Sequence, residues 1–165
     1  MIFQKPLESW TITSPFGPRN VPGISAYHNG IDLRAAINTP VFAIADGKVF
    51  NSYYNELGGK QLLVDHADGY RSGFAHLTKS IVNNGDTVKK GQLIAYTGNT
   101  GASNAPHLHF TMKQNNIPLD PEKIDYEKKK DQSPWWPGIP LPEPSARNVG
   151  LVIIALIAFY LFSRK

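Results

Sequence analysis

The chain has 165 residues, which is enough for one globular domain with a substantial hydrophobic core. It contains no cysteine, and this excludes disulfide bonds, thiolate zinc sites, iron–sulfur clusters and a cysteine nucleophile. The formal net charge is +4, and the lysines and arginines are not clustered as in a nucleic-acid-binding surface. Any metal site must therefore be built from histidine and carboxylate side chains.

The pattern of residues 1–127 predicts short strands and turns. Residues 1–10 have no long apolar run and so lack the pattern of a secretory signal peptide. Turn residues separate the predicted strands, and no segment keeps a 3.6-residue apolar period for three turns. Closely spaced strands without helices predict a mainly β fold, either an antiparallel sheet or a sandwich. Strands are expected at residues 41–45, 48–54, 61–66, 70–77, 92–97 and 107–112.

The first chemically notable cluster is His28-Asn-Gly-Ile-Asp32. Imidazole and carboxylate groups are suitable ligands for Zn²⁺ when thiolates are absent. Gly30 permits a tight bend that would bring the two side chains to one point. A His-x-x-x-Asp motif is frequent by chance, so this cluster alone is a weak signal.

Two further histidines lie on predicted strands in the middle of the chain. His76, within Phe74-Ala-His-Leu77, is a candidate for proton transfer beside a metal, and the alternative is a strand histidine on the solvent face. His66 precedes a turn, and we expect it to lie at the surface or to support metal ligands from outside.

The second cluster is His107-Leu-His109 on the last predicted strand. Residues i and i+2 of a strand share a face, so both imidazoles point one way while Leu108 points into the core. The two clusters together offer four groups, one more than the three protein ligands of a catalytic zinc. The spare imidazole can take a proton from water and hand it to a leaving amine, although the spacing does not decide which histidine is spare.

The end of the chain has a different composition. Five of the seventeen residues 131–147 are proline, which prevents a helix and favours an extended linker. Residues 149–162 carry no charged side chain and are flanked by basic residues. As a helix this run is about 21 Å long, shorter than a ~30 Å hydrocarbon core. We predict a globular domain over residues 1–130, a linker over 131–147 and a single-pass C-terminal membrane helix over 148–165, with a buried terminal helix as the alternative.

Several blocks of sequence occur in the order in which they occur in one family. These include Thr13-Ser-Pro-Phe-Gly-Pro-Arg19, the cluster at 28–32 and Pro106-His-Leu-His-Phe110. Further blocks lie at residues 39–49, 65–71, 74–77, 88–94 and 98–101. Over residues 11–124 the chain resembles the lysostaphin/LytM-type zinc endopeptidases of bacterial cell walls.

This resemblance implies a site and a substrate. It implies that His28, Asp32 and His109 bind Zn²⁺. It also implies that His107 and His76 flank the reacting water, as general base and as stabiliser of the tetrahedral intermediate. The fold would be the β-rich groove of this peptidase type, similar to a duplicated hybrid motif, and the scissile bond an amide in the cross-links or stem peptides of peptidoglycan.

Two functions are carried forward from the sequence. The first is an active, membrane-anchored zinc endopeptidase of peptidoglycan. No signal peptide or prosegment is visible before His28. We therefore expect a phage product on the membrane of a lipid-containing virion, with a protein of the bacterial envelope as the alternative. The second is an inactive peptidoglycan-binding or amidase-activating module with the same anchor, and the intact ligand set favours the first. The family commonly has Glu where Thr111 stands here, a change that we expect to touch no ligand.

Overall fold

The computed structural model describes residues 2–20 and 25–127, which form short strands and two 3₁₀ turns. The first strands are β1 (Ile12–Ser14), β2 (Gly17–Pro18), β3 (Tyr27–His28), β4 (Ile31–Arg34), β5 (Pro40–Phe42) and β6 (Gly47–Asn55). They are followed by β7 (Gly59–His66), β8 (Tyr70–Ser80), β9 (Thr87–Val88), β10 (Leu93–Thr97), β11 (His107–Gln114) and β12 (Ile117–Leu119). The 3₁₀ turns are η1 (Ala67–Gly69) and η2 (Pro121–Lys123).

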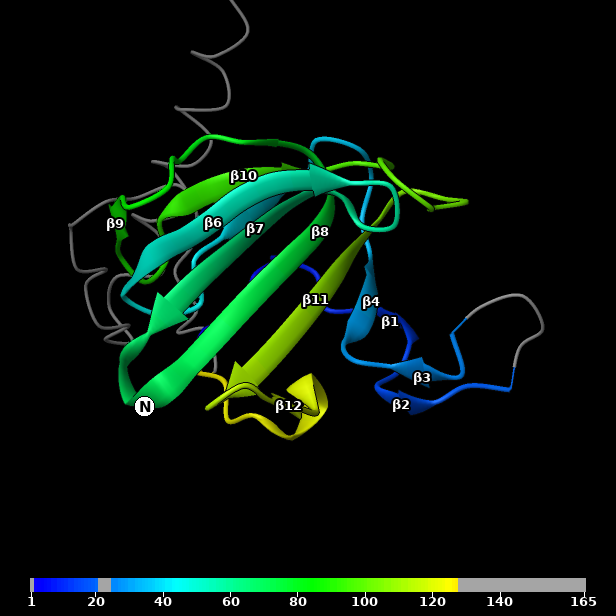
Figure 1. Cartoon of the computed structure of the whole chain (residues 1–165), viewed down its shortest axis with the longest axis horizontal. Coiled ribbons are helices and arrows are strands. Elements are labelled where there is room, and N and C mark those ends of the chain that lie inside the picture. The colour runs from blue at the N-terminus through cyan, green and yellow to red at the C-terminus, as the bar shows by residue number, and fades with distance from the viewer. Residues whose placement is uncertain (1, 21–24, 128–165) are drawn as a thin grey trace, which may run out of the picture. The chain divides into compact units, whose positions relative to one another are not determined.

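One large antiparallel sheet dominates the fold (Figure 1). Its main path runs β1-β4-β11-β8-β7-β6-β9, while β12 pairs with β11, β10 pairs with β8 and β5 pairs with β10. Strands β2 and β3 form a separate two-stranded ribbon. The expected mainly β, antiparallel architecture is therefore confirmed. Of the two expected forms, the structure has the sheet: ten strands form one continuous sheet, and β2 and β3 lie outside it.

Strand β8 lies at the centre of the main path of the sheet, and it changes its partner along its length. Its first residues, through Ala75, pair with β11, and the residues from Leu77 onward pair with β10. His76 lies at the change and has a φ of 58°, a left-handed conformation that is unusual for a residue other than glycine. Its backbone N–H donates to the carbonyl oxygen of Gly58 at 2.8 Å. The bend thus places a histidine where three strands meet.

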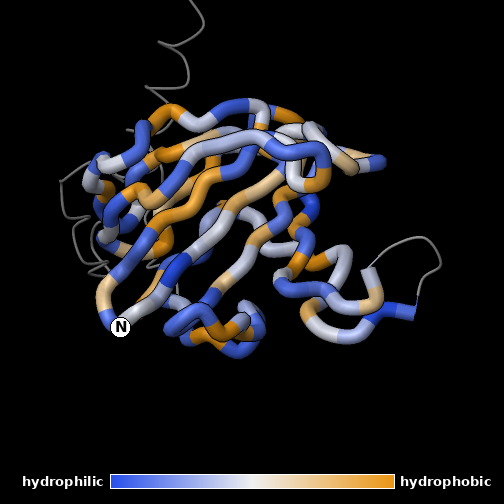
Figure 2. Tube along the Cα trace, viewed as in Figure 1, coloured by the Kyte–Doolittle hydropathy of each residue, from blue (hydrophilic) through white to orange (hydrophobic). Residues whose placement is uncertain are grey.

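The core is formed by alternate residues of the central strands. Leu108, Phe110 and Met112 of β11 are fully buried, and Phe110 is the cross-strand partner of the buried Phe74. The two phenylalanine rings stack with centroids 5.6 Å apart. Burial of a side chain of this size stabilises the fold by about 1.5–3 kcal/mol. Figure 2 shows the apolar segments running along the strands. Because this face is committed to the core, the intervening histidines of β11 must face the other way.

The predicted strands are present with one partial exception. Five of the six expected segments coincide with β6, β7, β8, β10 and β11 to within a few residues. The segment 41–45 is different, because β5 ends at Phe42 and the chain then bends. Ala43, Ile44 and Ala45 are nevertheless buried. Their apolar character thus predicted burial correctly but not strand pairing.

The tail of the chain lies outside the described residues. The predicted linker at 131–147, the predicted anchor at 148–165 and its expected C-terminal helix all lie in this tail. In the part of the chain that is described, no helix is long and apolar enough to cross a bilayer. The chain divides into a compact unit of Met1–Lys128 and a second unit of Lys129–Lys165. The three-part organisation therefore stays a prediction.

Candidate metal centre

Neighbouring strands bring together the residues of the two sequence clusters. Strands β4 and β11 are antiparallel neighbours, and their register makes Asp32 and His109 direct partners. His109 Nδ1 lies 2.8 Å from Asp32 Oδ1. His28 ends β3, and the bend that follows brings its Nε2 to 3.0 Å from His109 Nδ1 and 3.2 Å from Asp32 Oδ1. Three ligand-type atoms therefore converge on one point.

The spacing of these atoms fits a tetrahedral zinc site. Zinc–ligand bonds of ~2.0–2.2 Å in tetrahedral geometry place the ligand atoms about 3.3 Å apart. The three separations here are 2.8, 3.0 and 3.2 Å. His28 Nδ1 lies 2.8 Å from the carbonyl oxygen of Pro15, which can only accept, so Nδ1 carries the proton and the Nε2 lone pair faces the centre. Nitrogen and carboxylate donors that converge in this way are suited to Zn²⁺.

The carboxylate of Asp32 is held in its charged form and in a fixed orientation. Burial alone would raise the pKa of Asp32, but the hydrogen bonds and electrostatic interactions with His109 and His28 outweigh this and hold the pKa far below its usual range. The second oxygen, Oδ2, accepts a hydrogen bond from the Arg19 guanidinium at 3.1 Å. Arg19 in turn donates to Ser14 Oγ at 2.8 Å. Arg19 therefore turns Oδ1 toward the two imidazoles, a role that its place in the block 13–19 did not reveal.

The remaining two predicted site histidines face the same space. His107 Nε2 lies 3.7 Å from Asp32 Oδ1, and its Nδ1–H donates to the carbonyl oxygen of Ala105 at 2.8 Å. The ring centroids of His76 and His107 are 4.6 Å apart. Burial is the main cause that lowers the pKa of His76. The structure thus gathers all five predicted site residues at one place.

His76 is oriented by the loop that contains Thr100 and Gly101. Its Nδ1–H donates to the carbonyl oxygen of Thr100 at 2.8 Å, which leaves the Nε2 lone pair free. Thr100 Oγ1 also donates to the carbonyl of Leu77 at 2.9 Å and accepts from the N–H of Lys60 at 3.0 Å. A side chain on Gly101 would lie 2.2 Å from the backbone nitrogen of Gly59. The loop is therefore locked against the β6–β7 hairpin, and this contact holds His76.

A groove of about 910 Å³ surrounds the five residues. One wall is the loop around Ser103 and Asn104, and another is the β6–β7 hairpin tip with Leu57. Tyr27, from the β2–β3 ribbon, lines a further part of the groove. The site thus lies in an open groove and not in an enclosed cavity.

Thr111 packs between two strands. It is the cross-strand partner of Gly73, and its Oγ1 would lie 2.4 Å from a side chain placed there. A Cβ on Gly30 would lie 2.8 Å from the methyl group of Thr111 and 2.3 Å from the carbonyl oxygen of Phe110. Gly30 is therefore required for the close packing of the chain against β11 at this point.

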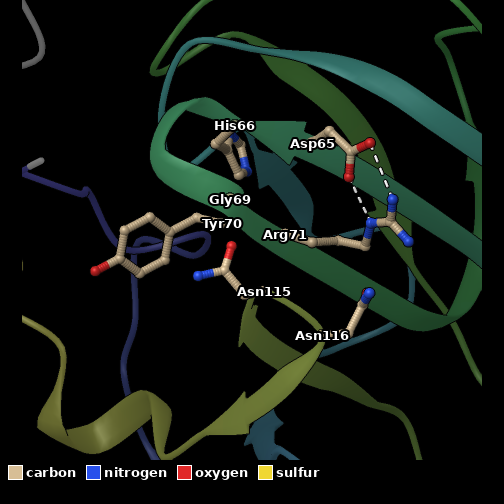
Figure 3. Close-up of a pocket in the computed structure, with 7 residues that line it drawn as sticks. All are labelled: Asp65, His66, Gly69, Tyr70, Arg71, Asn115 and Asn116. Atoms are coloured by element: carbon tan, nitrogen blue, oxygen red, sulfur yellow. Dashed lines mark hydrogen bonds and ion pairs between the residues drawn. The ribbon is translucent and has the colours of Figure 1, made fainter.

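The expectation for His66 is wrong. It is 8% exposed, its Nδ1–H donates to the carbonyl of Asp46 at 3.0 Å, and its Nε2 accepts from Ser72 Oγ at 2.8 Å. It lies at the far end of β7 from the metal centre, beside a small pocket (Figure 3). In this pocket Asp65 pairs with Arg71. His66 is therefore a buried histidine with both ring nitrogens hydrogen-bonded. The sequence did not predict this, because the Ser72 hydroxyl that bonds to it belongs to the next strand.

Comparison with known proteins agrees with this geometry. Residues 26–121 match the sequence profile of Peptidase family M23. The chain belongs to this family. The M23 domain is 38% identical, over 125 residues, to peptidoglycan DD-endopeptidase ShyB of Vibrio cholerae, covering 74% of this chain and 29% of that protein. It is 40% identical, over 104 residues, to the glycyl-glycine endopeptidase ALE-1 of Staphylococcus capitis, covering 62% and 29% of the two chains. The chain thus spans about three tenths of the length of these relatives.

Solved structures match the M23 domain in fold. A zinc-containing peptidase from Vibrio cholerae superposes with a TM-score of 0.71 at 36% identity, covering 77% of this chain and 41% of that one. The catalytic domain of lysostaphin from Staphylococcus simulans superposes with a TM-score of 0.63 at 36% identity, covering 68% and 90%. The resemblance inferred from the sequence blocks is confirmed, and zinc is the metal that the family and the donor set share.

Proposed function

We propose that this chain is a zinc-dependent endopeptidase that hydrolyses amide bonds in peptidoglycan cross-links or stem peptides. The observation that carries the proposal is the convergence of three ligand atoms, 2.8–3.2 Å apart, beside two further imidazoles in an open groove. The endopeptidase names of the relatives support the same reaction.

The proposed roles follow from the hydrogen bonds of each ring. His28, Asp32 and His109 would hold Zn²⁺. Bound there, Zn²⁺ supplies Lewis acidity, which lowers the pKa of a water and polarises a substrate carbonyl. Arg19 keeps the Asp32 carboxylate in place through its bond to Oδ2.

The proton is handled by the other two histidines. His107 accepts the proton of the attacking water at Nε2, because its Nδ1–H is engaged by Ala105. The protonated Nε2 then donates to the leaving nitrogen. His76 presents its own Nε2 to the same space and, when it carries the proton, stabilises developing negative charge.

The test is to measure zinc and products on the same sample of the full chain in mild detergent. We expect about one zinc per chain and release of new amines from purified sacculi, both removed by a chelator and restored by added zinc. Product masses then identify the bond. Zinc-independent binding to sacculi without release, even after zinc is added back, would instead support the inactive wall-binding or amidase-activating module.

We further propose that residues 148–165 anchor the domain in a membrane through a single pass, with residues 131–147 as the spacer. The support is the uncharged run 149–162 and its basic flanks. The membrane is that of a lipid-containing virion or of the bacterial envelope. In a vesicle flotation assay the full chain should float, and the double substitution Ile154→Lys and Ile157→Lys should leave it at the bottom of the gradient. Equal flotation of both would contradict the anchor.

A further inference from the structure

An arginine without an acidic partner stands beside the reacting groups. Arg34 follows Asp32 by two residues on β4, so the two side chains share the face that lines the groove. Across the sheet, Arg34 is the direct partner of His107 on β11, and such partners have Cα atoms about 4.5–5.5 Å apart. The Arg34 side chain is exposed, and within residues 2–20 and 25–127 no carboxylate pairs with it.

The charge of the groove makes this guanidinium available to a ligand. The acidic side chain that lines the groove is Asp32, and both of its oxygens are engaged, Oδ1 by imidazoles and Oδ2 by Arg19. The positive charge of Arg34 is therefore not compensated within the groove. A guanidinium binds carboxylates through two parallel hydrogen bonds, and it does so most strongly where water is partly excluded.

We propose that Arg34 binds a substrate carboxylate located on the carbon that carries the scissile nitrogen. This inference rests on the proposed function, because His107 places the leaving nitrogen next to itself when it donates its proton. Arg34 is the cross-strand neighbour of His107, so a carboxylate one carbon away from that nitrogen lies within its reach.

This arrangement selects between classes of peptidoglycan bond. In a D-alanyl–diaminopimelate cross-link the carbon bearing the scissile nitrogen also bears a free carboxylate, and the same holds for a stem peptide that ends in D-alanyl-D-alanine. In a polyglycine bridge that carbon bears another amide. Arg34 therefore favours the anionic cross-links and stem termini over neutral glycine bridges.

The first test is binding without turnover. The full chain, freed of metal by a chelator, is titrated with a short peptide carrying this carboxylate and with its carboxamide analogue. We expect the carboxylate to bind about 10- to 100-fold more tightly, the effect of a charged hydrogen-bonded pair, and Arg34→Gln to reduce the preference to about twofold or less. Lys113→Gln is the matched control, because it removes one cation from β11 outside the groove lining and should keep the preference.

The second test is turnover of zinc-loaded protein. Substrates are the cross-linked dimer with a free carboxylate, the same dimer amidated, a pentapeptide ending in D-alanyl-D-alanine, and pentaglycine. We expect Arg34→Gln to lower kcat/KM about 10- to 100-fold for the substrates with the free carboxylate and about threefold or less for the other two. The ratio of dimer to pentapeptide turnover separates cross-link from terminus as the carboxylate source.

The outcomes separate the two proposals. Equal losses on acid and amide substrates, or no carboxylate preference in the binding assay, overturn the role of Arg34 while leaving the endopeptidase in place. If zinc-loaded wild-type protein cleaves none of the four substrates, the endopeptidase proposal fails, and the binding assay on metal-free protein still decides whether Arg34 recognises the carboxylate.

Discussion

Asp32 and His109 are direct cross-strand partners, and their side chains meet with Oδ1 2.8 Å from Nδ1. The pairing of β4 with β11 therefore joins two sequence clusters that lie far apart in the chain. A one-residue slip of β4 against β11 would turn the side chain of Asp32 to the opposite face, away from His109. Metal binding in this protein consequently depends on the same backbone ladder that builds the core.

The first prediction separates the metal ligands from the proton-transfer histidine. His109→Ala and Asp32→Ala should lose zinc and activity together, since each removes one of three ligands. His107→Ala should keep most of the zinc while kcat falls by roughly 10²–10⁴-fold, the usual contribution of a general base. Zinc content by mass spectrometry and turnover on the same samples check this. If His107→Ala loses zinc as fully as His109→Ala, the assignment of the two roles is wrong.

The second prediction concerns Arg19, which donates to Asp32 Oδ2. Arg19→Gln should weaken zinc affinity by about 10- to 100-fold, because the carboxylate loses the group that orients it. Arg19→Lys should lie between this variant and the wild type. Competition with a chromogenic chelator measures the affinity. Arg34→Gln, in the same groove but not bonded to Asp32, is the control and should retain the zinc affinity of the wild type.

The third prediction uses two glycines with similar backbone angles. Gly101 and Gly85 have φ of 75° and 88°, but a Cβ on Gly101 would clash with Gly59 whereas a Cβ on Gly85 meets nothing within 4 Å. Gly85→Ala should cost about 1–2 kcal/mol of unfolding free energy with little effect on kcat. Gly101→Ala should in addition displace the loop that holds His76 and lower kcat at least tenfold. Denaturant titration and kinetics distinguish the two, and equal kcat values would argue against the locking contact.

The fourth prediction is a pH dependence of stability caused by His66. Burial lowers the pKa of His66 in the folded protein, so the unfolded chain takes up its proton at higher pH than the folded one. The contribution of neutral His66 to the free energy of unfolding is therefore complete above the unfolded pKa of about 6.5. This contribution is lost as the pH falls below that value. Unfolding free energies at pH 7.5 and 5.5 measure the slope.

His66→Gln is the variant for this measurement. It should be less stable at pH 7.5, because the bonds to Asp46 and Ser72 are disturbed, but its stability should depend less on pH. His76, whose pKa burial also lowers, supplies part of the remaining slope. An unchanged slope in His66→Gln would show that His66 does not titrate in this window.

Part of the site was predictable because its information is local. The alternation of β11 follows from a two-residue period, so the shared face of His107 and His109 follows from their spacing in the sequence. The strands around Leu62, Phe74 and Ile94 were predicted because apolar residues between turn signals favour burial. The resemblance to the family then named the ligand set, which spacing alone had left open.

Contacts between distant segments were not predictable in this way. Arg19 reaches Asp32, and Thr100 reaches His76, through a register that no local pattern specifies. His66 is buried because Asp46 and Ser72 satisfy both ring nitrogens, and neither partner is evident from the residues beside it.

The sequence by itself determined the chemistry of this protein: nitrogen and carboxylate donors without thiols, strands without helices over residues 1–127, and a proline-rich segment followed by an uncharged run with basic flanks. Tertiary structure alone decided the tautomers of His28, His76 and His107 and the position of Arg34 beside His107. The physical reason is that residue type and period are properties of neighbours along the chain. Hydrogen-bond partners and charge environment arise when strands that are distant in sequence pair with one another.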